Sequence, residues 1–326
     1  MRKLGLLVIC LTLLSIAAAG AQARTVVVYS AHEDNIISEM VPRCKAETGL
    51  DVEFVKLASA DVIKRVVAES GNPQCDVIWS IGGEQLEANS SVLEKYVPKE
   101  WDKIAPVFKV GTNWLPYTGI MNVLIVNTKL VSASLMPTKW ADLLAPAFKG
   151  KISTARADKS GSAYMQLCNV LVAFKDTGWD TYKKLANNFF IASGSSAVPK
   201  AVNDGEAWVG VTLEDNAFRY VKGGGPVKIV YPEEGVVAAP DGIALVKGAP
   251  HPDAGKAFID WCLSKPTQDY LVTAMFRRSV RVDGLQTPGL PALSQIETLS
   301  YDFQWAASNN KDFIKKFTDI MMELGF

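Results

Sequence analysis

Hydrophobic residues recur along the chain with two alternating periods. Short runs rich in β-branched residues at 25–31, 50–57 and 75–81 are typical of strands, whereas 35–49 and 60–73 place apolar residues at helical spacing. The resulting order of strand, helix, strand, helix, strand predicts a parallel sheet with helices on both faces.

The middle of the chain repeats this alternation. The segment 121–130 (MNVLIVNTKL) is a further predicted strand, as are KISTARA, AWVGVTL and GIALVKG, while SGSAYMQLCNVLVAF and DTYKKLANNF have helical spacing. At a length of 326 residues, two α/β lobes fit this pattern better than one continuous sheet.

The first 23 residues have the pattern of a secretory signal peptide. Arg2 and Lys3 form a charged start, an apolar stretch follows, and Ala21-Gln22-Ala23 is an A-x-A cleavage site. The apolar stretch is shorter than the roughly 20 residues that a membrane span needs. We therefore expect cleavage after Ala23 and a soluble protein that acts in the periplasm.

Composition excludes several classes of partner. The 34 basic and 34 acidic residues give a formal net charge of zero, and no long basic run is present. This balance argues against binding to nucleic acid or to a membrane surface. We expect a monomer whose ligand is a small molecule.

Four cysteines follow the predicted signal peptide. An oxidising compartment permits disulfides, so a Cys44–Cys75 pair and single buried thiols both remain open. The cysteine spacing fits no zinc motif, and we expect neither a bound metal nor a cofactor.

Small polar residues follow the predicted strands. In open parallel sheets, ligands bind outside the carboxyl ends of the strands, where helix N-termini also point. Hydroxyl residues and glycines at these positions cap helices and leave backbone N–H groups facing outward, which together make an anion site. Any one serine taken alone is better explained as a helix cap, but their recurrence at one sheet edge favours a shared anion-binding cleft. The candidates are Ser30, Ser59, Gly83, Ser160, Gly161, Ser162, Ser193, Ser195 and Ser196.

Acidic residues occupy two further positions of this kind. Glu214 and Asp215 directly follow a predicted strand, and Glu234 lies in the segment YPEEG. Carboxylates at such an edge can serve as catalysts, as metal ligands or as acceptors for a ligand's hydroxyl or amine groups. His32, beside Glu33, is either a structural histidine or a cleft residue. Because GxSxG, HExxH, GxxxxGK[ST] and GxGxxG are all absent, we do not expect an enzyme.

Taken together, several segments resemble the periplasmic solute-binding proteins of ABC importers, in the group that contains ferric-ion-binding and sugar-phosphate-binding proteins. The resemblance covers essentially all of the chain after residue 23. It rests on VVVYSAHED, ETGLDVEFV, NPQCDVIWS, ADKSGSAY, GEAWVGVTLEDNA and GAPHPDAGKAFIDWCLSKPTQ.

The resemblance implies a type 2 periplasmic-binding fold. Two α/β lobes, each a mostly parallel sheet flanked by helices, would close about a hinge on a ligand in the cleft between them, with an inner-membrane ABC permease as partner. We expect lobe 1 to comprise residues 24–125 and 238–283, and lobe 2 to comprise 126–237 and 284–326.

Differences within this group bear on the ligand. Ferric binders resemble this chain at His32 but carry adjacent tyrosines where it has Glu214-Asp215. The sugar-phosphate binders are similar at Glu214, Asp215 and Glu234. We therefore expect a small organophosphate, either a hexose phosphate or a phosphonate, with the acids at its non-phosphate end.

Three alternatives remain open. They are a ferric-iron receptor of the same fold, a solute receptor for a membrane sensor kinase, and an exported hydrolase. The family often carries a basic residue near the hinge, so one of Arg277, Arg278 and Arg281 is a further candidate to reach the ligand, with surface solvation as the other explanation.

Overall fold

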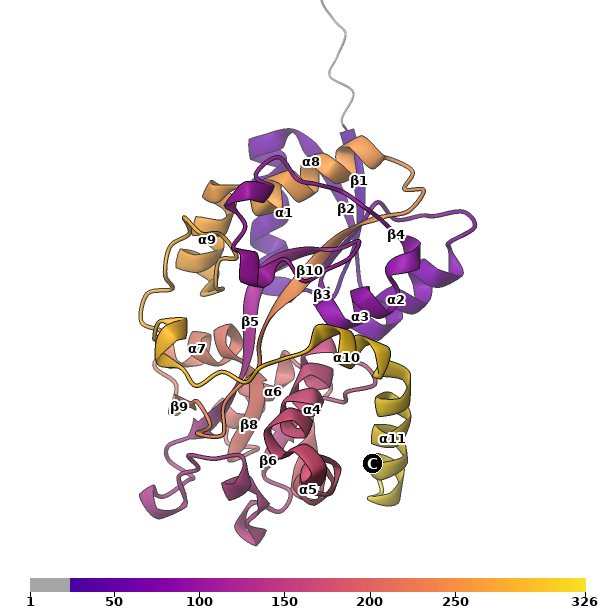
Figure 1. Cartoon of the computed structure of the whole chain (residues 1–326). Helices are drawn as coiled ribbons and strands as arrows, with labels where there is room; N and C mark the ends of the chain where they lie inside the picture. The colour runs from indigo at the N-terminus through magenta and orange to yellow at the C-terminus, as the bar shows by residue number, and fades with distance from the viewer. Residues whose placement is uncertain (1–23) are drawn as a thin grey trace, which may run out of the picture.

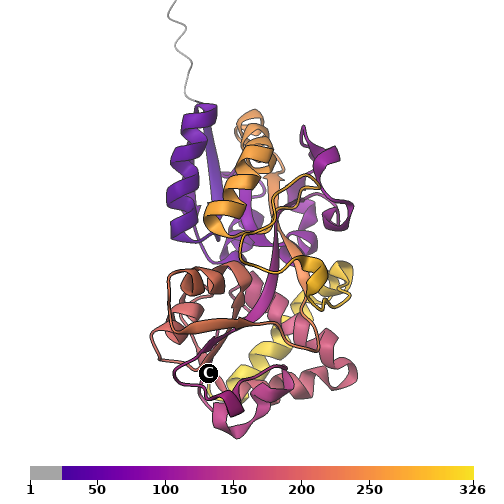
Figure 2. The same cartoon turned by 90° about the vertical axis from the view of Figure 1, so that its left-hand side faces the viewer.

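The computed structural model describes residues 24–326, so the predicted signal peptide lies outside the described residues. Two lobes are stacked one above the other (Figure 1), and the view turned by 90° shows the same division (Figure 2). Among the described residues, no helix has the length and apolarity to cross a bilayer.

Lobe 1 is built around three parallel strands. Helices cover both of its faces, and alternate residues of β1 face opposite sides: Val26 and Val28 pack under α1 and α8, whereas Tyr29 packs under α2. The elements are β1 (Arg24–Ser30), α1 (Asp34–Thr48), β2 (Leu50–Lys56), α2 (Ser59–Ala68), β3 (Val77–Gly82), α3 (Gly83–Ala88), β4 (Leu93–Glu94), α8 (Pro252–Leu263) and α9 (Lys265–Met275).

Lobe 2 has the same layered construction, with α4, α5 and α11 packing on one face of its sheet and α6 and α7 lying toward the other (Figure 1). Its elements are β6 (Ile152–Thr154), α4 (Gly161–Phe174), α5 (Gly178–Ala186), β7 (Phe189–Ile191), α6 (Ala197–Asn203), β8 (Val209–Leu213), α7 (Glu214–Lys222), β9 (Val227–Val230) and α11 (Asn310–Glu323).

Two long strands run between the lobes. The first half of β5 (Leu115–Asn127) pairs with β10 (Ala238–Val246), and its second half pairs with β8. Because β5 serves both lobes, the ten strands of residues 24–326 form one path in the order β2-β1-β3-β10-β5-β8-β6-β7, with β4 beside β10 and β9 beside β5. The outer strands are parallel and the connecting strands are antiparallel, so the two-lobed α/β fold is confirmed with a mixed sheet at its centre.

The C-terminal segment contacts both lobes. Phe303, at the start of α10 (Phe303–Ser308), packs against Trp114 of lobe 1, whereas Phe317 of α11 packs against Tyr182 of lobe 2. The division of the chain at residues 125, 237 and 283 stays a prediction.

The four cysteines of the described residues are free, buried thiols. Cys44 lies in the core under α1 and α8, and Cys75 lies in the core on the opposite face of the same sheet. The sheet therefore separates the two sulfur atoms, and the structure favours the alternative of single thiols.

Candidate functional site

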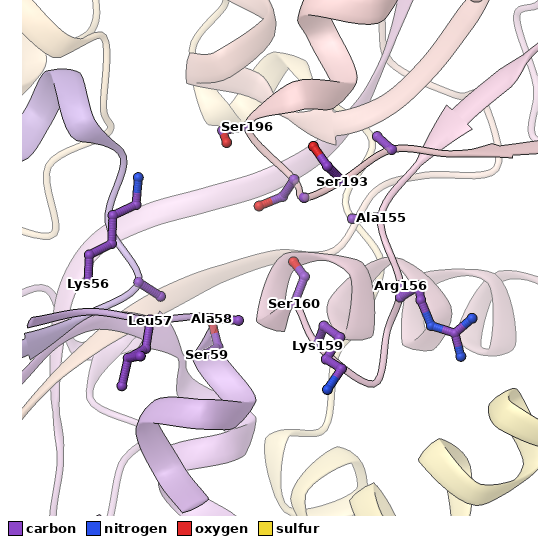
Figure 3. Close-up of a pocket in the computed structure, with 14 residues that line it drawn as sticks. Lys56, Leu57, Ala58, Ser59, Ala155, Arg156, Lys159, Ser160, Ser193 and Ser196 are labelled. Atoms are coloured by element: carbon purple, nitrogen blue, oxygen red, sulfur yellow. The ribbon is translucent and has the colours of Figure 1, made fainter. Parts of the chain in front are cut away.

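A cavity of about 420 Å³, here called the outer cavity, lies between the lobes (Figure 3). Lobe 1 contributes the loops after β1 and β2, and lobe 2 contributes the loops after β6 and β7, so every wall follows the carboxyl end of a parallel strand. The lining residues are Ala31, Lys56, Leu57, Ala58, Ser59, Ala155, Arg156, Lys159, Ser160, Ala192, Ser193, Gly194, Ser195 and Ser196.

Serine hydroxyl groups line much of this cavity. Ser160 caps α4, because its Oγ accepts a hydrogen bond of 3.3 Å from the backbone N–H of Ala163. The hydroxyl groups of Ser193, Ser195 and Ser196 make no hydrogen bond within residues 24–326. These three hydroxyls are therefore available to a ligand.

Two helices, α2 and α4, begin at the outer cavity. The first N–H groups of a helix lack partners within the helix, and they carry the positive end of its dipole. Among the described residues, the N–H groups of Ser59, Gly161 and Ser162 have no acceptor. This arrangement suits an anion.

The cavity also carries one lysine without a counter-charge. Lys56 lies 2.6 Å from Asp34, and Arg156 is paired with Asp158 at 2.9 Å. Lys159, the third cation of the lining, makes no ion pair with any described residue. The outer cavity therefore has one positive charge in excess.

A smaller space of about 60 Å³, here called the inner chamber, adjoins the outer cavity and shares Ala31, Ser59, Ser160 and Ser195 with it. Its share of liquid water would be about two molecules, at roughly 30 Å³ each. The chamber is bounded by polar side chains: His32, Glu33, Ser80, Ser162, Asn216, Asp241 and Arg277.

Arg277 is the central cation of the inner chamber. Its side chain is 4% exposed, and its guanidinium donates to Asp215 at 3.0 Å and to Asp241 at 2.6 Å. Burial by itself would lower the pKa of Arg277, but the two carboxylates hold that pKa above its usual value. Burial raises the pKa of Asp241, and Arg277 opposes that shift.

The neighbouring arginine neutralises the other acid of the pair. Arg278 donates two hydrogen bonds to Glu214, at 2.6 and 2.8 Å, and the Tyr231 hydroxyl donates a third at 2.5 Å. Glu214 and Asp215 are therefore occupied by protein partners, and neither lines the outer cavity or the inner chamber.

Glu33 links the lobes across the inner chamber. Its Oε2 lies 2.7 Å from an amino group of Arg219 in α7. Burial and the nearby Asp215 carboxylate raise the pKa of Glu33, whereas Arg219 and Arg277 lower it, with a net increase. Burial, together with the same two arginines, holds the pKa of His32 well below its usual value, so its imidazole is neutral.

The lobes also touch through their backbones. A Cβ on Gly161 of α4 would lie 2.9 Å from the backbone N of Gly82 in lobe 1, and the N–H of Ala60 donates to the carbonyl of Lys159 at 3.3 Å. Ser80, in the wall of the inner chamber, has a φ of 57°, which is rare for a residue with a side chain. Backbone strain of this kind concentrates at functional sites.

Three residues that the sequence suggested for the site have other partners. The Ser30 hydroxyl is buried and donates to the carbonyl of Trp79. Gly83 packs against the Trp114 ring. The Glu234 carboxylate accepts the N–H groups of Trp140 and Ala141 at 2.9 and 3.0 Å, which stabilises a turn of lobe 2. None of the three lines either space.

The inner chamber also contains residues that sequence reasoning missed. Asn216 follows the predicted acidic pair by one position, so its place after a strand was a usable signal. Asp241 lies inside the strand β10, where nothing in the local pattern marks it.

Comparison with known proteins identifies the family. The model for bacterial extracellular solute-binding proteins matches residues 39–298. The chain belongs to this family.

Similar proteins include relatives with different ligands in their names. A putative 2-aminoethylphosphonate-binding periplasmic protein of Salmonella typhimurium is 30% identical over 252 residues, covering 72% of this chain and 71% of that protein. An Fe(3+)-binding periplasmic protein of Serratia marcescens is 24% identical over 327 residues, covering 94% of each chain. The periplasmic binding protein AfuA of Actinobacillus pleuropneumoniae, solved with exogenous fructose-6-phosphate, superposes with a TM-score of 0.87 at 23% identity, covering 93% of this chain and 99% of AfuA.

These findings establish the general role. The protein is the substrate-binding protein of an ABC importer, a periplasmic binding protein that binds a small ligand and works with a membrane permease. It is not an enzyme.

Proposed function

We propose that this protein captures a small organic phosphate or phosphonate for import, with the phosphorus group in the outer cavity. The observation that carries the proposal is the set of unoccupied donors there: three free serine hydroxyls, the free backbone N–H of Ser59 and the unpaired Lys159, with the N-terminus of α4 beginning at the lining residue Ser160. A tetrahedral oxyanion accepts hydrogen bonds on every side, and it matches donors that surround a cavity.

The names of its relatives support the same class of ligand. The Salmonella relative is named for an aminoethylphosphonate, and AfuA was solved with a hexose phosphate. Both ligands combine a phosphorus oxyanion with a short polar organic part. We expect Ser59, Ser160, Ser193, Ser195 and Ser196 to hold the oxyanion, and the inner chamber to receive the other end.

The charge arrangement argues against ferric iron. A hard cation needs several anionic oxygen ligands, but Asp215 and Asp241 are bound by Arg277, and Glu214 is bound by Arg278. Within residues 24–326, no group of three or more histidine, cysteine or acidic side chains is arranged to hold a metal ion. The arginines supply the positive charge that a cation would otherwise bring.

The test is calorimetric titration of ligand-free protein, produced from the full-length sequence, with inorganic phosphate, 2-aminoethylphosphonate, fructose 6-phosphate and ferric citrate. We expect at least one of the two organic ligands to bind. Ser195→Ala should weaken that binding by roughly 10- to 100-fold, because a hydrogen bond to a charged group contributes about 1.5–3 kcal/mol.

Ser308→Ala is the matched control, because Ser308 is an exposed serine far along the chain in α10. It should leave affinity unchanged. Tight binding of ferric citrate, with none of the phosphorus compounds binding, would overturn the proposal.

A further inference from the structure

The inner chamber carries an excess negative charge, in contrast to the outer cavity. Among its lining residues, Glu33 and Asp241 carry carboxylates and Arg277 carries a guanidinium group. Outside the lining, Asp215 pairs with Arg277 and Arg219 pairs with Glu33, so the whole cluster has three carboxylates and two guanidinium groups. The neutral His32 adds no charge. One buried carboxylate is therefore left without a cation of its own.

Glu33 is the carboxylate with spare capacity. Asp215 is bound by Arg277, and Asp241 accepts from Arg277, from Ser80 and twice from Thr118. Glu33 approaches Arg219 at 2.7 Å, yet its buried Oε2 makes no properly aligned hydrogen bond. Arg219 is also shared, because it donates to Asn216 at 3.0 Å.

The two spaces thus form a dipolar site, with one cation in excess in the outer cavity and one anion in excess in the inner chamber. A neutral polyol would leave the excess carboxylate uncompensated on closure, and a buried charge without a partner is strongly unfavourable. An ammonium group would pair with it.

The size of the inner chamber points in the same direction. About 60 Å³ admits a group of two or three non-hydrogen atoms and not a hexose ring. A short alkyl chain that ends in an ammonium group satisfies both the volume and the charge.

From this geometry we infer that the ligand is a zwitterion, an aminoalkyl phosphonate or phosphate, whose ammonium group binds Glu33 in the inner chamber. The inference rests on the proposed function, because it places the oxyanion in the outer cavity. It makes Glu33 the residue that determines specificity within the phosphorus-containing solutes.

The test compares 2-aminoethylphosphonate with propylphosphonate, which has the same shape with a methyl group in place of the ammonium. In calorimetric titrations of the ligand-free protein, 2-aminoethylphosphonate should bind at least 30-fold more tightly than propylphosphonate. Glu33→Gln should reduce that ratio at least tenfold. Glu53→Gln removes an exposed carboxylate of the same lobe and should leave the ratio unchanged.

Three outcomes would overturn the inference. The first is an affinity for propylphosphonate within threefold of that for 2-aminoethylphosphonate. The second is a higher affinity for fructose 6-phosphate than for 2-aminoethylphosphonate. Both are measured on the unaltered protein, so they do not depend on whether Glu33→Gln folds. The third is an equal loss for both phosphonates in Glu33→Gln, which would mean that Glu33 only holds the lobes together through Arg219. In each case a phosphorus compound still binds, whereas loss of all such binding would instead refute the proposed function.

Discussion

Removal of the Arg277 side chain should strongly destabilise the folded protein. That side chain is 4% exposed and holds two carboxylates that are themselves almost fully buried, Asp215 and Asp241. Arg277→Met keeps the length of the side chain and leaves both acids without a cation. Breaking a buried ion pair by removing one partner costs about 3–5 kcal/mol. That is a large part of the roughly 5–15 kcal/mol that stabilises a typical domain.

Thermal unfolding measures this loss. At roughly 1.6 °C per kcal/mol for a chain of this size, Arg277→Met should lower the melting temperature by about 5–8 °C. Arg281→Met is the comparison: Arg281 is equally buried, but its partners Glu100 and Asp283 are half exposed. Its loss should cost less, because solvent can stabilise those carboxylates.

Uncompensated buried charge can be distinguished from lost side-chain packing as the cause of the destabilisation. If uncompensated charge is responsible, then changing Asp215→Asn and Asp241→Asn in the Arg277→Met background should recover at least half of the lost stability. A single variant within about 1 kcal/mol of the parent would refute the reasoning, and so would a triple variant no more stable than the single one.

Three other consequences can be tested in the same protein. Gly161→Ala should weaken ligand binding about tenfold or more, because the added methyl group meets the backbone of Gly82 and hinders the approach of the two lobes. Gly71→Ala, which has no atom near its added Cβ, should leave the affinity unchanged. Equal affinities of the two variants would mean that ligand binding does not need the Gly161–Gly82 contact. Glu234→Ala should lower the free energy of unfolding in urea by about 1–2 kcal/mol, because it removes the acceptor of two backbone hydrogen bonds. The ligand affinity measured by calorimetry should stay unchanged. Lost affinity with unchanged stability would mean that Glu234 contacts the ligand. The preference for 2-aminoethylphosphonate over propylphosphonate should fall as pH is lowered from 8 to 5. The pKa of Glu33, which faces Asp215, Arg219, Arg277 and Asn216, is raised, and a protonated Glu33 cannot pair with an ammonium group. A constant ratio of the two affinities across that pH range would contradict this role of Glu33.

Much of the fold follows from local patterns. The strand expected at 25–31 is β1 (Arg24–Ser30), and the helix expected at 35–49 is α1 (Asp34–Thr48), which ends at a left-handed glycine, Gly49. In both cases the period of the apolar residues reports which face is buried.

The least predictable strand is the one that joins the lobes. The strand expected at 121–130 is in fact β5 (Leu115–Asn127), and all of its residues are buried. A strand covered on both faces shows no alternation, so its start cannot be read from periodicity. The last two helices, α10 and α11, were not anticipated.

Local patterns anticipated which loops line the two spaces better than they anticipated the partners of the acidic residues. The loops around Ser59, Ser160 and Ser195 lie at the ends of parallel strands, and the topology of the sheet brings such ends together. The arginine partners of Glu214 and Asp215 are more than 60 positions away in the chain, at Arg278 and Arg277. Nothing in the segment that contains the acids reveals that arginines reach them.

The ion pairs beside the inner chamber influence its charge, and therefore the kind of ligand that it suits. The acids of α7, Glu214 and Asp215, form buried ion pairs with Arg278 and Arg277, so a change in either partner would alter the charge beside the inner chamber, at a cost in stability. Replacing an arginine would leave a carboxylate without its cation and should increase the affinity for cationic groups. Adding an arginine beside Glu33 would neutralise that carboxylate and should remove the preference for an ammonium group. If the proposed function is right, the balance of charge in the inner chamber, more than the framework, selects the ligand of this protein.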